Sequence, residues 1–298
     1  MEKEEKISCL FLLTTVLMWG LQPAVTKILL ASYTTMTVVC IRSTLMVAGY
    51  LTVMKCLTGS FCFPRKQDLP LLAFLGLLGT PLNNIPQYAG LEYTTAFNCS
   101  LMGATVPTLT AILASILARE RLRPIQWCGI AISFAGVVWM LSQGDLSRLT
   151  GLHFNKGDLM ILFSEVTWAL YIIYSRPAMK RMRPLQVTGW SNVLGVAMMY
   201  PYAAWTGDVH FSMPDGPLLL AFLYVSLLAG ILAMLFWNIG VKHLGPSRAA
   251  IFSNLTPVFG LFFANLILNE PFHPYQFISL AAVLAGVYLL IHFPYTCR

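Results

Sequence analysis

Charged residues are scarce in this chain of 298 residues: they make up 10% of it, against about 25% in an ordinary soluble domain. Hydrophobic residues make up 57%. Such a composition leaves too little charge to cover the surface of a soluble domain of this size. It places the chain among integral membrane proteins.

Motifs for hydrolytic and nucleotide-driven chemistry are also missing. The sequence contains no HExxH, no GxSxG and no GxxxxGK[ST]. Its five histidines fall in loops or at the ends of apolar segments, and its seven cysteines include no CxxC pair and no zinc-type spacing. These absences argue against a membrane enzyme, a metal site and a cofactor. Any transport activity should therefore draw its energy from an ion or solute gradient.

Long apolar segments take up most of the sequence. A membrane-spanning helix needs roughly 20 mostly apolar residues, and ten segments fit this requirement: 8–30, 36–56, 69–90, 94–118, 124–141, 157–175, 186–205, 217–240, 248–269 and 274–293. The first has no small-residue cleavage site, so we expect it to be retained. The sequence predicts an all-α integral membrane protein with ten transmembrane helices.

Basic residues gather on one side of these predicted spans. If the chain crosses ten times from a cytoplasmic N-terminus, fifteen lysines and arginines fall inside, and only Arg148 and Lys156 fall outside. This is the bias that orients helices in membranes. It accounts for the net charge of +7 without a nucleic-acid partner. We expect a multi-pass protein of the cell (inner) membrane with cytoplasmic termini, whose partners are the lipid bilayer and a small-molecule substrate.

The second half of the chain repeats the first at an offset of 150 residues. Nine residues recur without a gap, and the pairs include Pro107 with Pro257, Glu120 with Glu270, and Gly136 with Gly286. Five spans per half is an odd number, so the second half enters the membrane from the opposite side, and the arginines of loop 119–123 are absent from loop 269–273. We predict two inverted five-helix repeats, 8–141 and 157–293, as in many secondary transporters.

Several residues also carry a resemblance to a known family. Trp19, Gly20 and Lys27 in the first span, Arg42 in the second and the repeated block E-x-x-x-P-x-Q-x(8)-A-G resemble the EamA type of the drug/metabolite transporter superfamily. The resemblance covers essentially the whole chain. It implies a ten-helix carrier that moves small metabolites and often exports amino acids or related compounds.

Other functions stay open at this point. A transporter or flippase of another substrate class, such as a nucleobase, sugar, organic cation or lipid-linked intermediate, fits the same sequence. A channel is a further alternative, and saturable, pH-dependent flux would distinguish a carrier from it. We expect a monomer or a weak homodimer that works by alternating access.

Glu165 is the one acidic residue predicted to lie in the middle of a span. A charged side chain at the bilayer centre costs at least about 2.5 kcal/mol, so it usually faces a cavity or a partner. We therefore expect Glu165 to couple transport to protons or to bind a substrate amine. The alternative is a protonated carboxyl group that hydrogen-bonds to a neighbouring helix.

Three basic residues accompany this carboxylate within or beside the spans. Arg42 lies early in the second span and is a candidate for binding a substrate carboxylate. Lys27 lies near the outer end of the first span, where its side chain could simply extend to the membrane surface. Arg176 matches Lys27 at an offset of 149 near the cytoplasmic end. A base facing the same cavity as Glu165 would suit a zwitterionic amino acid.

Two tryptophans fall near the middle of equivalent spans. Trp19 and Trp168 are separated by 149 residues, and Gln22 shares a helical face with Trp19. Carriers hold their substrates near the midplane where the repeats meet. We predict that these side chains line the substrate pathway, with packing against a neighbouring helix as the alternative.

The third span has the densest set of polar residues. Asn84, Gln87 and Tyr88 share one face, and Pro81 and Pro86 lie among them. Amides that faced lipid would be costly, so this face should point inward. Prolines remove backbone hydrogen bonds and should bend the helix. We predict that this span lines the pathway and opens or closes it, with interhelical hydrogen bonding as the alternative.

Two further sequence pairs concern the shape of the bundle. Pro107 and Pro257 fall mid-span in equivalent helices and are candidates for hinges, or for kinks that fix a static helix shape. The pairs 135–136 and 285–286 are both Ala–Gly, which permits close helix approach. By the family resemblance these pairs lie at the edge of the bundle, where they would serve packing or dimerisation.

Overall fold

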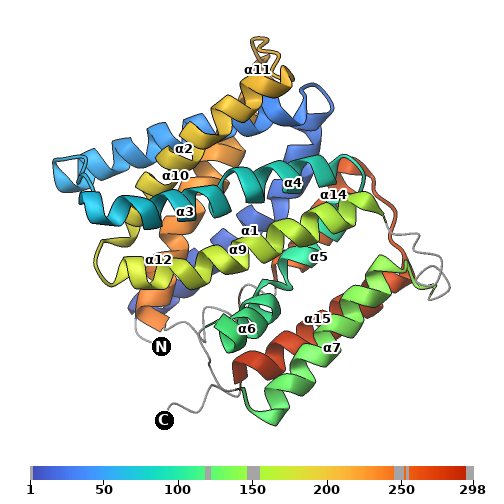
Figure 1. Ribbon diagram of the computed structural model, residues 1–298. Coiled ribbons are helices and arrows are strands. Elements are labelled where there is room, and N and C mark those ends of the chain that lie inside the picture. The colour runs from blue at the N-terminus through green and yellow to red at the C-terminus, as the bar shows by residue number, and fades with distance from the viewer. Residues whose placement is uncertain (1–2, 118–121, 146–154, 245–251, 253–254, 293–298) are drawn as a thin grey trace.

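The computed structural model describes residues 3–117, 122–145, 155–244, 252 and 255–292, and every regular element within them is helical (Figure 1). Six long helices run without a change of type: α1 Lys3–Leu30, α2 Thr35–Thr58, α7 Pro124–Leu141, α9 Lys156–Met179, α10 Pro184–Thr206 and α15 Pro274–His292. Their bounds lie within a few residues of the predicted spans. The first part of predicted span 248–269 lies outside the described residues, and α14 Thr256–Leu268 forms the rest.

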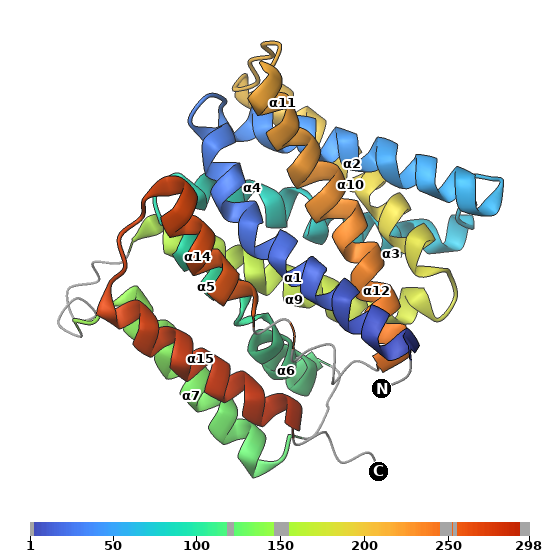
Figure 2. The same cartoon turned by 180° about the vertical axis from the view of Figure 1, so that it is seen from behind.

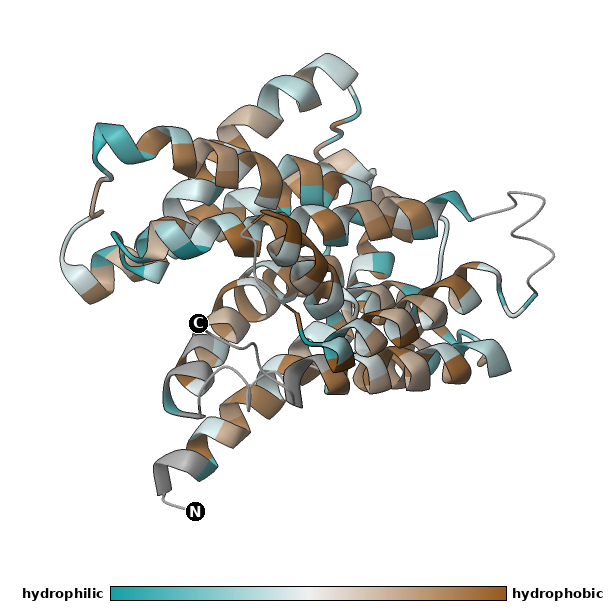
Figure 3. Cartoon of the chain, turned by 60° about the horizontal axis from the view of Figure 1, so that its bottom comes forward, coloured by the Kyte–Doolittle hydropathy of each residue, from teal (hydrophilic) through white to brown (hydrophobic). Residues whose placement is uncertain are grey.

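Seven stretches of the described chain are long and apolar enough to cross a membrane: Lys6–Leu30, Thr35–Thr58, Lys66–Leu91, Ala96–Leu117, Pro124–Leu141, Lys156–Met179 and Gly216–Trp237. Two shorter apolar helices cover Thr256–Leu268 and Pro274–Leu289. Figure 3 shows hydrophobic residues along the helices and hydrophilic residues mainly at their ends and in the loops. The chain is therefore built as a multi-pass membrane protein.

Two of these stretches are each divided into two helices. In the third predicted span, α3 Leu69–Gly79 is followed by Thr80, whose φ of −117° and ψ of −80° are not helical. α4 Pro81–Leu91 begins at the next residue. In the fourth, α5 Ala96–Gly103 and α6 Val106–Leu117 are separated by two residues. The expected bend in the third span is confirmed.

The prolines predicted to kink mid-span helices instead lie at helix starts. Pro107 is the second residue of α6, and Pro257 is the second residue of α14. Proline is tolerated there because the first turn of a helix has no backbone acceptor for its missing N–H. Pro107 therefore follows the two-residue interruption between α5 and α6 instead of kinking one continuous helix. Residues 253–254, just before α14, lie outside the described residues, so the role expected of Pro257 stays a prediction.

The eighth predicted span changes helix type in its middle. α11 Gly216–Leu223 leads into a π-helical stretch, η2 Tyr224–Leu232, and then into α12 Ala233–Leu244. The wider turn frees carbonyl groups, and side chains of neighbouring helices bond to them. Tyr50 Oη on α2 donates to Gly230 O at 3.2 Å. α1 lies between α12 and α14 (Figure 2).

α7 and α15 lie side by side at one edge of the molecule (Figures 1 and 2). A Cβ atom added to Gly136 would lie 3.2 Å from Val283 Cγ2, and one added to Gly286 would lie 2.6 Å from Ser133 N. The Ala–Gly pairs thus permit close packing, as predicted. Both glycines are used within the chain, so they do not form a free dimerisation surface.

Candidate functional site

Arg42 is a buried cation near the middle of the bundle. It is the eighth residue of α2, and its side chain is 8% exposed. Its Nη1 donates to Asn84 Oδ1 on α4 at 3.2 Å, and its guanidinium carbon lies 5.5 Å from the centre of the Tyr88 ring. Within the described chain, Arg42 Nε and the Tyr88 hydroxyl are both buried without a hydrogen-bond partner. These two groups keep unused hydrogen-bonding capacity.

Glu165 is buried halfway along α9. Its side chain is 4% exposed, and Oε1 accepts a hydrogen bond from Gln87 Nε2 on α4 at 3.2 Å. A Cβ atom added to Gly103, the last residue of α5, would lie 4.0 Å from the same oxygen. The carboxyl group therefore lies between α4 and the break that separates α5 from α6.

α4 holds these two opposite charges apart. Asn84 contacts Arg42, and Gln87 contacts Glu165. The two amides are three residues apart on one helical face. No ion pair joins Arg42 to Glu165 or to any other carboxylate in the described chain. Burying a charge without a counter-ion is costly, so this arrangement needs an explanation beyond packing.

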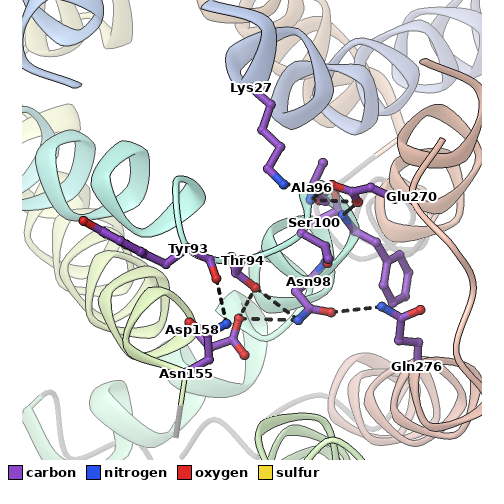
Figure 4. Close-up of polar contacts among 12 residues, drawn as sticks. Lys27, Tyr93, Thr94, Ala96, Asn98, Ser100, Asn155, Asp158, Glu270 and Gln276 are labelled. Carbon is purple, nitrogen blue, oxygen red and sulfur yellow. Dashed lines mark hydrogen bonds and ion pairs between the residues drawn. The ribbon is translucent and has the colours of Figure 1, made fainter. Parts of the chain in front are cut away.

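A second polar group, which we call the outer network, lies at the C-terminal end of α1 (Figure 4). Its side chains are those of Lys27, Thr94, Asn98, Asp158, Glu270 and Gln276. Glu270, in the loop before α15, accepts a hydrogen bond from Lys27 Nζ at 2.9 Å. Its carboxylate also accepts hydrogen bonds from the backbone nitrogens of Ala96 at 3.0 Å and Phe97 at 3.4 Å, at the start of α5. A carboxylate at a helix N-terminus is favoured because the unpaired N–H groups and the helix dipole attract negative charge.

The outer network continues through buried side chains to α9 and α15. Asp158 is 0% exposed and accepts hydrogen bonds from the Thr94 hydroxyl and from Asn98 Nδ2. The Asn98 Oδ1 atom accepts a hydrogen bond from Gln276 Nε2 on α15 at 3.2 Å. The two parts of this network connect α1, α5, α9 and α15.

Lys27 is paired with a carboxylate, which argues against the alternative that its side chain simply extends to the membrane surface. The Lys27 side chain is 27% exposed, and its ammonium group forms an ion pair with Glu270, whose side chain is 12% exposed. Arg176 lies exposed in the last turn of α9, near the opposite end of the bundle (Figure 1). In the first half, the residue that matches Glu270 is Glu120, which lies outside the described residues.

The structure separates the two midplane tryptophans. Trp19 Nε1 donates to Ala229 O in η2 at 3.1 Å. Trp168 stacks on Tyr171 with ring centroids 4.9 Å apart and packs against an apolar cluster of α3 and α9. Gln22 is half-buried, and no hydrogen bond from it is formed within the described chain. These contacts favour packing over substrate binding for Trp168.

Two residues of the outer network escaped the sequence analysis. Glu270 was recognised only as a member of the repeated block, and its position in a loop concealed that it is partly buried. Asp158 lies at a helix end, where polar residues usually need no special explanation. The recurrence of Glu270 at the repeat offset was the one signal that could have identified it.

The described part of the chain contains no group of three or more histidine, cysteine or acidic residues that could hold a metal ion. The arrangement offers hydrogen bonds and opposite charges in a buried setting. It can bind and orient a small polar molecule.

Comparisons with known proteins agree on one class. The model of the EamA-like transporter family matches residues 6–142 and again residues 155–292. An uncharacterized transporter of Bacillus subtilis, YyaM, is 31% identical over 215 residues, which cover 72% of this chain and 70% of the relative. A probable terminal-alkyne amino-acid exporter of Streptantibioticus cattleyicolor is 24% identical over 76% of this chain and 74% of its own length. A solved crystal structure with 19% identity has the same fold, with a TM-score of 0.66 over 95% of this chain and 94% of that one.

Proposed function

This chain belongs to the EamA-like transporter family, and from that premise we propose that it is a secondary carrier that exports amino acids or closely related metabolites by alternating access. The family and the relatives are membrane transporters and not enzymes. The chain is accordingly a multi-pass membrane transporter of a small molecule.

The proposed architecture is ten transmembrane helices in two inverted repeats, 8–141 and 157–293. The two separate matches to one family model support it. The packing of α7 on α15 supports it as well, because Gly136 meets Val283 just as Gly286 meets Ser133 at the same offset of 150 residues. Reciprocal contacts of this kind are expected when two copies of one unit face each other.

The proposed substrate site consists of Arg42, Asn84, Tyr88, Gln87 and Glu165. The observation that carries it is the pair of opposite charges, Arg42 and Glu165, buried on one face of α4 without a counter-ion. A zwitterionic amino acid would supply both missing charges. Its carboxylate would accept hydrogen bonds from Arg42 and the Tyr88 hydroxyl, and its ammonium group would donate to Glu165.

The outer network provides a proposed gate. It joins α1 and α5 of the first half to α9, α15 and the loop at Glu270 of the second half. Because Arg42, Tyr88 and Glu165 are almost fully buried, a substrate can reach them only after a rearrangement. The helix break before Pro107 lies beside Glu165, and the break at Thr80 precedes α4, which carries Gln87. These two breaks are the proposed places of movement.

Glu165 is also the proposed coupling residue. A carboxylate at this depth changes its charge when it takes up a proton, which would change the affinity for a substrate ammonium group. Proton exchange with the substrate amine at one site would link the two fluxes. The chain has no nucleotide-binding motif that would offer a different source of energy.

The proposed setting is the cell membrane with both termini in the cytoplasm, and the proposed working unit is a monomer. The distribution of lysine and arginine supports this orientation. The use of Gly136 and Gly286 within the chain supports a monomer, since the closest-packing surface is already covered. A nucleic-acid partner is not part of the proposal.

Efflux from proteoliposomes tests this function. Vesicles loaded with all twenty amino acids are followed by mass spectrometry, with and without a pH gradient. We expect selective loss of a few amino acids for the native chain and for Arg123→Gln, which changes an exposed cation far from the site. Arg42→Gln and Glu165→Gln should abolish that loss. Retention of every amino acid at the level of protein-free vesicles would contradict the amino-acid assignment.

A further inference from the structure

A separate group of charged residues lies at the other end of the bundle from the outer network. It is formed by the loop between α2 and α3 and the loop between α9 and α10. These loops enclose a cavity with a volume of about 440 Å³. Most of the side chains that line it are polar, namely Arg65, Gln67, Asp68, Arg181 and Gln186, and Phe63 and Met182 complete the lining.

The cavity is held in shape by hydrogen bonds from α10. Gln186 Nε2 donates to Cys62 O at 2.7 Å. Trp190 Nε1 lies 3.2 Å from both Phe61 O and Cys62 O. These bonds fix the loop before α3 against the start of α10. Arg65 and Arg181 therefore line the cavity from two different loops.

The charge of the cavity is positive. Arg65 and Arg181 form no ion pair within the described chain, and Asp68 is the one carboxylate that lines the cavity. Lys66 and Lys180 are exposed beside the two arginines and add to the positive potential. Asp68 reduces this charge without cancelling it. Guanidinium groups favour phosphate because their N–H groups match its oxygens in pairs.

The surroundings of the cavity point to a lipid as the source of this phosphate. Phe63 lines the cavity and is highly exposed, and Leu57 in the last turn of α2 is also exposed. Leu57 directly follows the predicted span 36–56, and Phe63 lies in the loop between that span and span 69–90, so both lie near the boundary where acyl chains meet headgroups. Basic pockets between transmembrane helices on this side of a membrane suit acidic lipid headgroups. A free anion would gain nothing from the apolar side chains.

We propose that this cavity binds the phosphate group of an anionic phospholipid from the leaflet it faces. Arg65 and Arg181 hold the phosphate from the two loops, while Phe63 packs against the glycerol and the upper acyl chains. The lipid then connects a loop of the first half to a loop of the second half. The site is independent of the central residues, so the proposal does not rest on the substrate class.

Native mass spectrometry of the full chain, titrated with phosphatidylglycerol or phosphatidylcholine of identical acyl chains, tests this proposal. We expect tighter binding of phosphatidylglycerol. Arg65→Gln and Arg181→Gln should each weaken it by about fivefold. Arg123→Gln removes an exposed cation at the start of α7, predicted to lie on the same side of the membrane, and should leave the affinity unchanged.

Two further measurements keep the result interpretable. Arg65→Lys with Arg181→Lys preserves the charge and should retain the preference for phosphatidylglycerol, which shows that the altered cavity is still folded. Inorganic phosphate at millimolar concentration should not displace the lipid. Equal binding of phosphatidylglycerol by the native chain and the double glutamine variant would overturn the proposal. Displacement by inorganic phosphate would also overturn it, because the site would then bind a free anion.

Discussion

The Lys27–Glu270 pair of the outer network and the central site both hold charged side chains with little exposure, but their charges are balanced differently. Asp158, the second carboxylate of the outer network, accepts hydrogen bonds from Thr94 and Asn98 and has no counter-ion in the described chain. In the outer network, Glu270 faces Lys27 and two backbone N–H groups at the start of α5. In the centre, Arg42 and Glu165 form hydrogen bonds with neutral side chains of α4 and lack a counter-ion in the described chain. The same kinds of side chain are therefore neutralised in one place and left unneutralised in the other.

This difference indicates that the outer network stabilises the structure, whereas the central residues bind a ligand. A buried charge that has lost its partner costs several kcal/mol, whereas a paired and hydrogen-bonded charge can hold elements together. The outer network has the properties of a lock between the two halves. The central residues have the properties of a site whose missing partner is a ligand.

Arg42→Gln should have the largest effect on transport. We expect a loss of about 100-fold in the initial efflux rate, because a hydrogen-bonded cation for the substrate carboxylate is removed. Thermal stability should stay the same or rise, since an uncompensated buried charge disappears. Arg42→Lys should recover part of the rate, because it keeps the charge without the planar fork. A fall in stability that accounts for the lost flux would contradict a ligand-binding role.

Glu270→Gln should lower thermodynamic stability, in contrast to Arg42→Gln. Without the carboxylate, Lys27 and the start of α5 lose their negative partner, and we expect the free energy of unfolding to fall by about 3 kcal/mol. The measurement is denaturation in detergent of Lys27→Met, Glu270→Gln and the double variant. The double variant should cost less than the sum of the single ones. Strict additivity would show that the two side chains are not coupled.

Gly286→Leu should affect packing at the edge, away from both charged groups. A Cβ atom there would lie 2.6 Å from Ser133 N. We therefore expect α7 and α15 to move apart and the free energy of unfolding to fall by about 1–3 kcal/mol. The matched control is Gly216→Leu, because a Cβ atom at Gly216 would meet nothing within 4 Å. Thermal midpoints of both variants check this. Similar midpoints would contradict close packing of α7 on α15.

The two tryptophans should give the smallest effects, and unequal ones. Trp19→Phe removes the hydrogen bond to Ala229 O in η2 and should cost about 1 kcal/mol of stability. Trp168→Phe can keep its stacking on Tyr171 and should change the KM for efflux little. A large rise in KM for Trp168→Phe alone would return that residue to the substrate pathway.

Much of the helical fold was predictable from the sequence because membrane spans need long apolar runs with internally satisfied backbones. The bounds of α1, α2, α7 and α15 follow from such runs. The π-helical stretch η2 could not be predicted, because it depends on which neighbours bond to its freed carbonyls. Trp19 and Tyr50 supply those bonds from distant parts of the chain.

The candidate site was predictable only in part. Glu165, Arg42 and the polar face of the third span stood out, because ionisable and amide side chains within spans are costly and therefore rare. Sequence alone could not show that Asn84 contacts Arg42 while Gln87 contacts Glu165, since those contacts depend on helix packing. It also could not show that Lys27 reaches Glu270 across 243 residues of sequence.

The most direct test of the central claim is a binding measurement that removes one charge at a time from both protein and ligand. An exported amino acid, its amine without the carboxylate and its N-acetyl form are titrated into the native chain, Arg42→Gln and Glu165→Gln. The account predicts that Arg42→Gln weakens binding of the amino acid but not of the amine. It equally predicts that Glu165→Gln weakens binding of the amino acid but not of the N-acetyl form. Equal weakening of all three ligands by both substitutions would contradict the claim that these residues hold the two charges of one substrate.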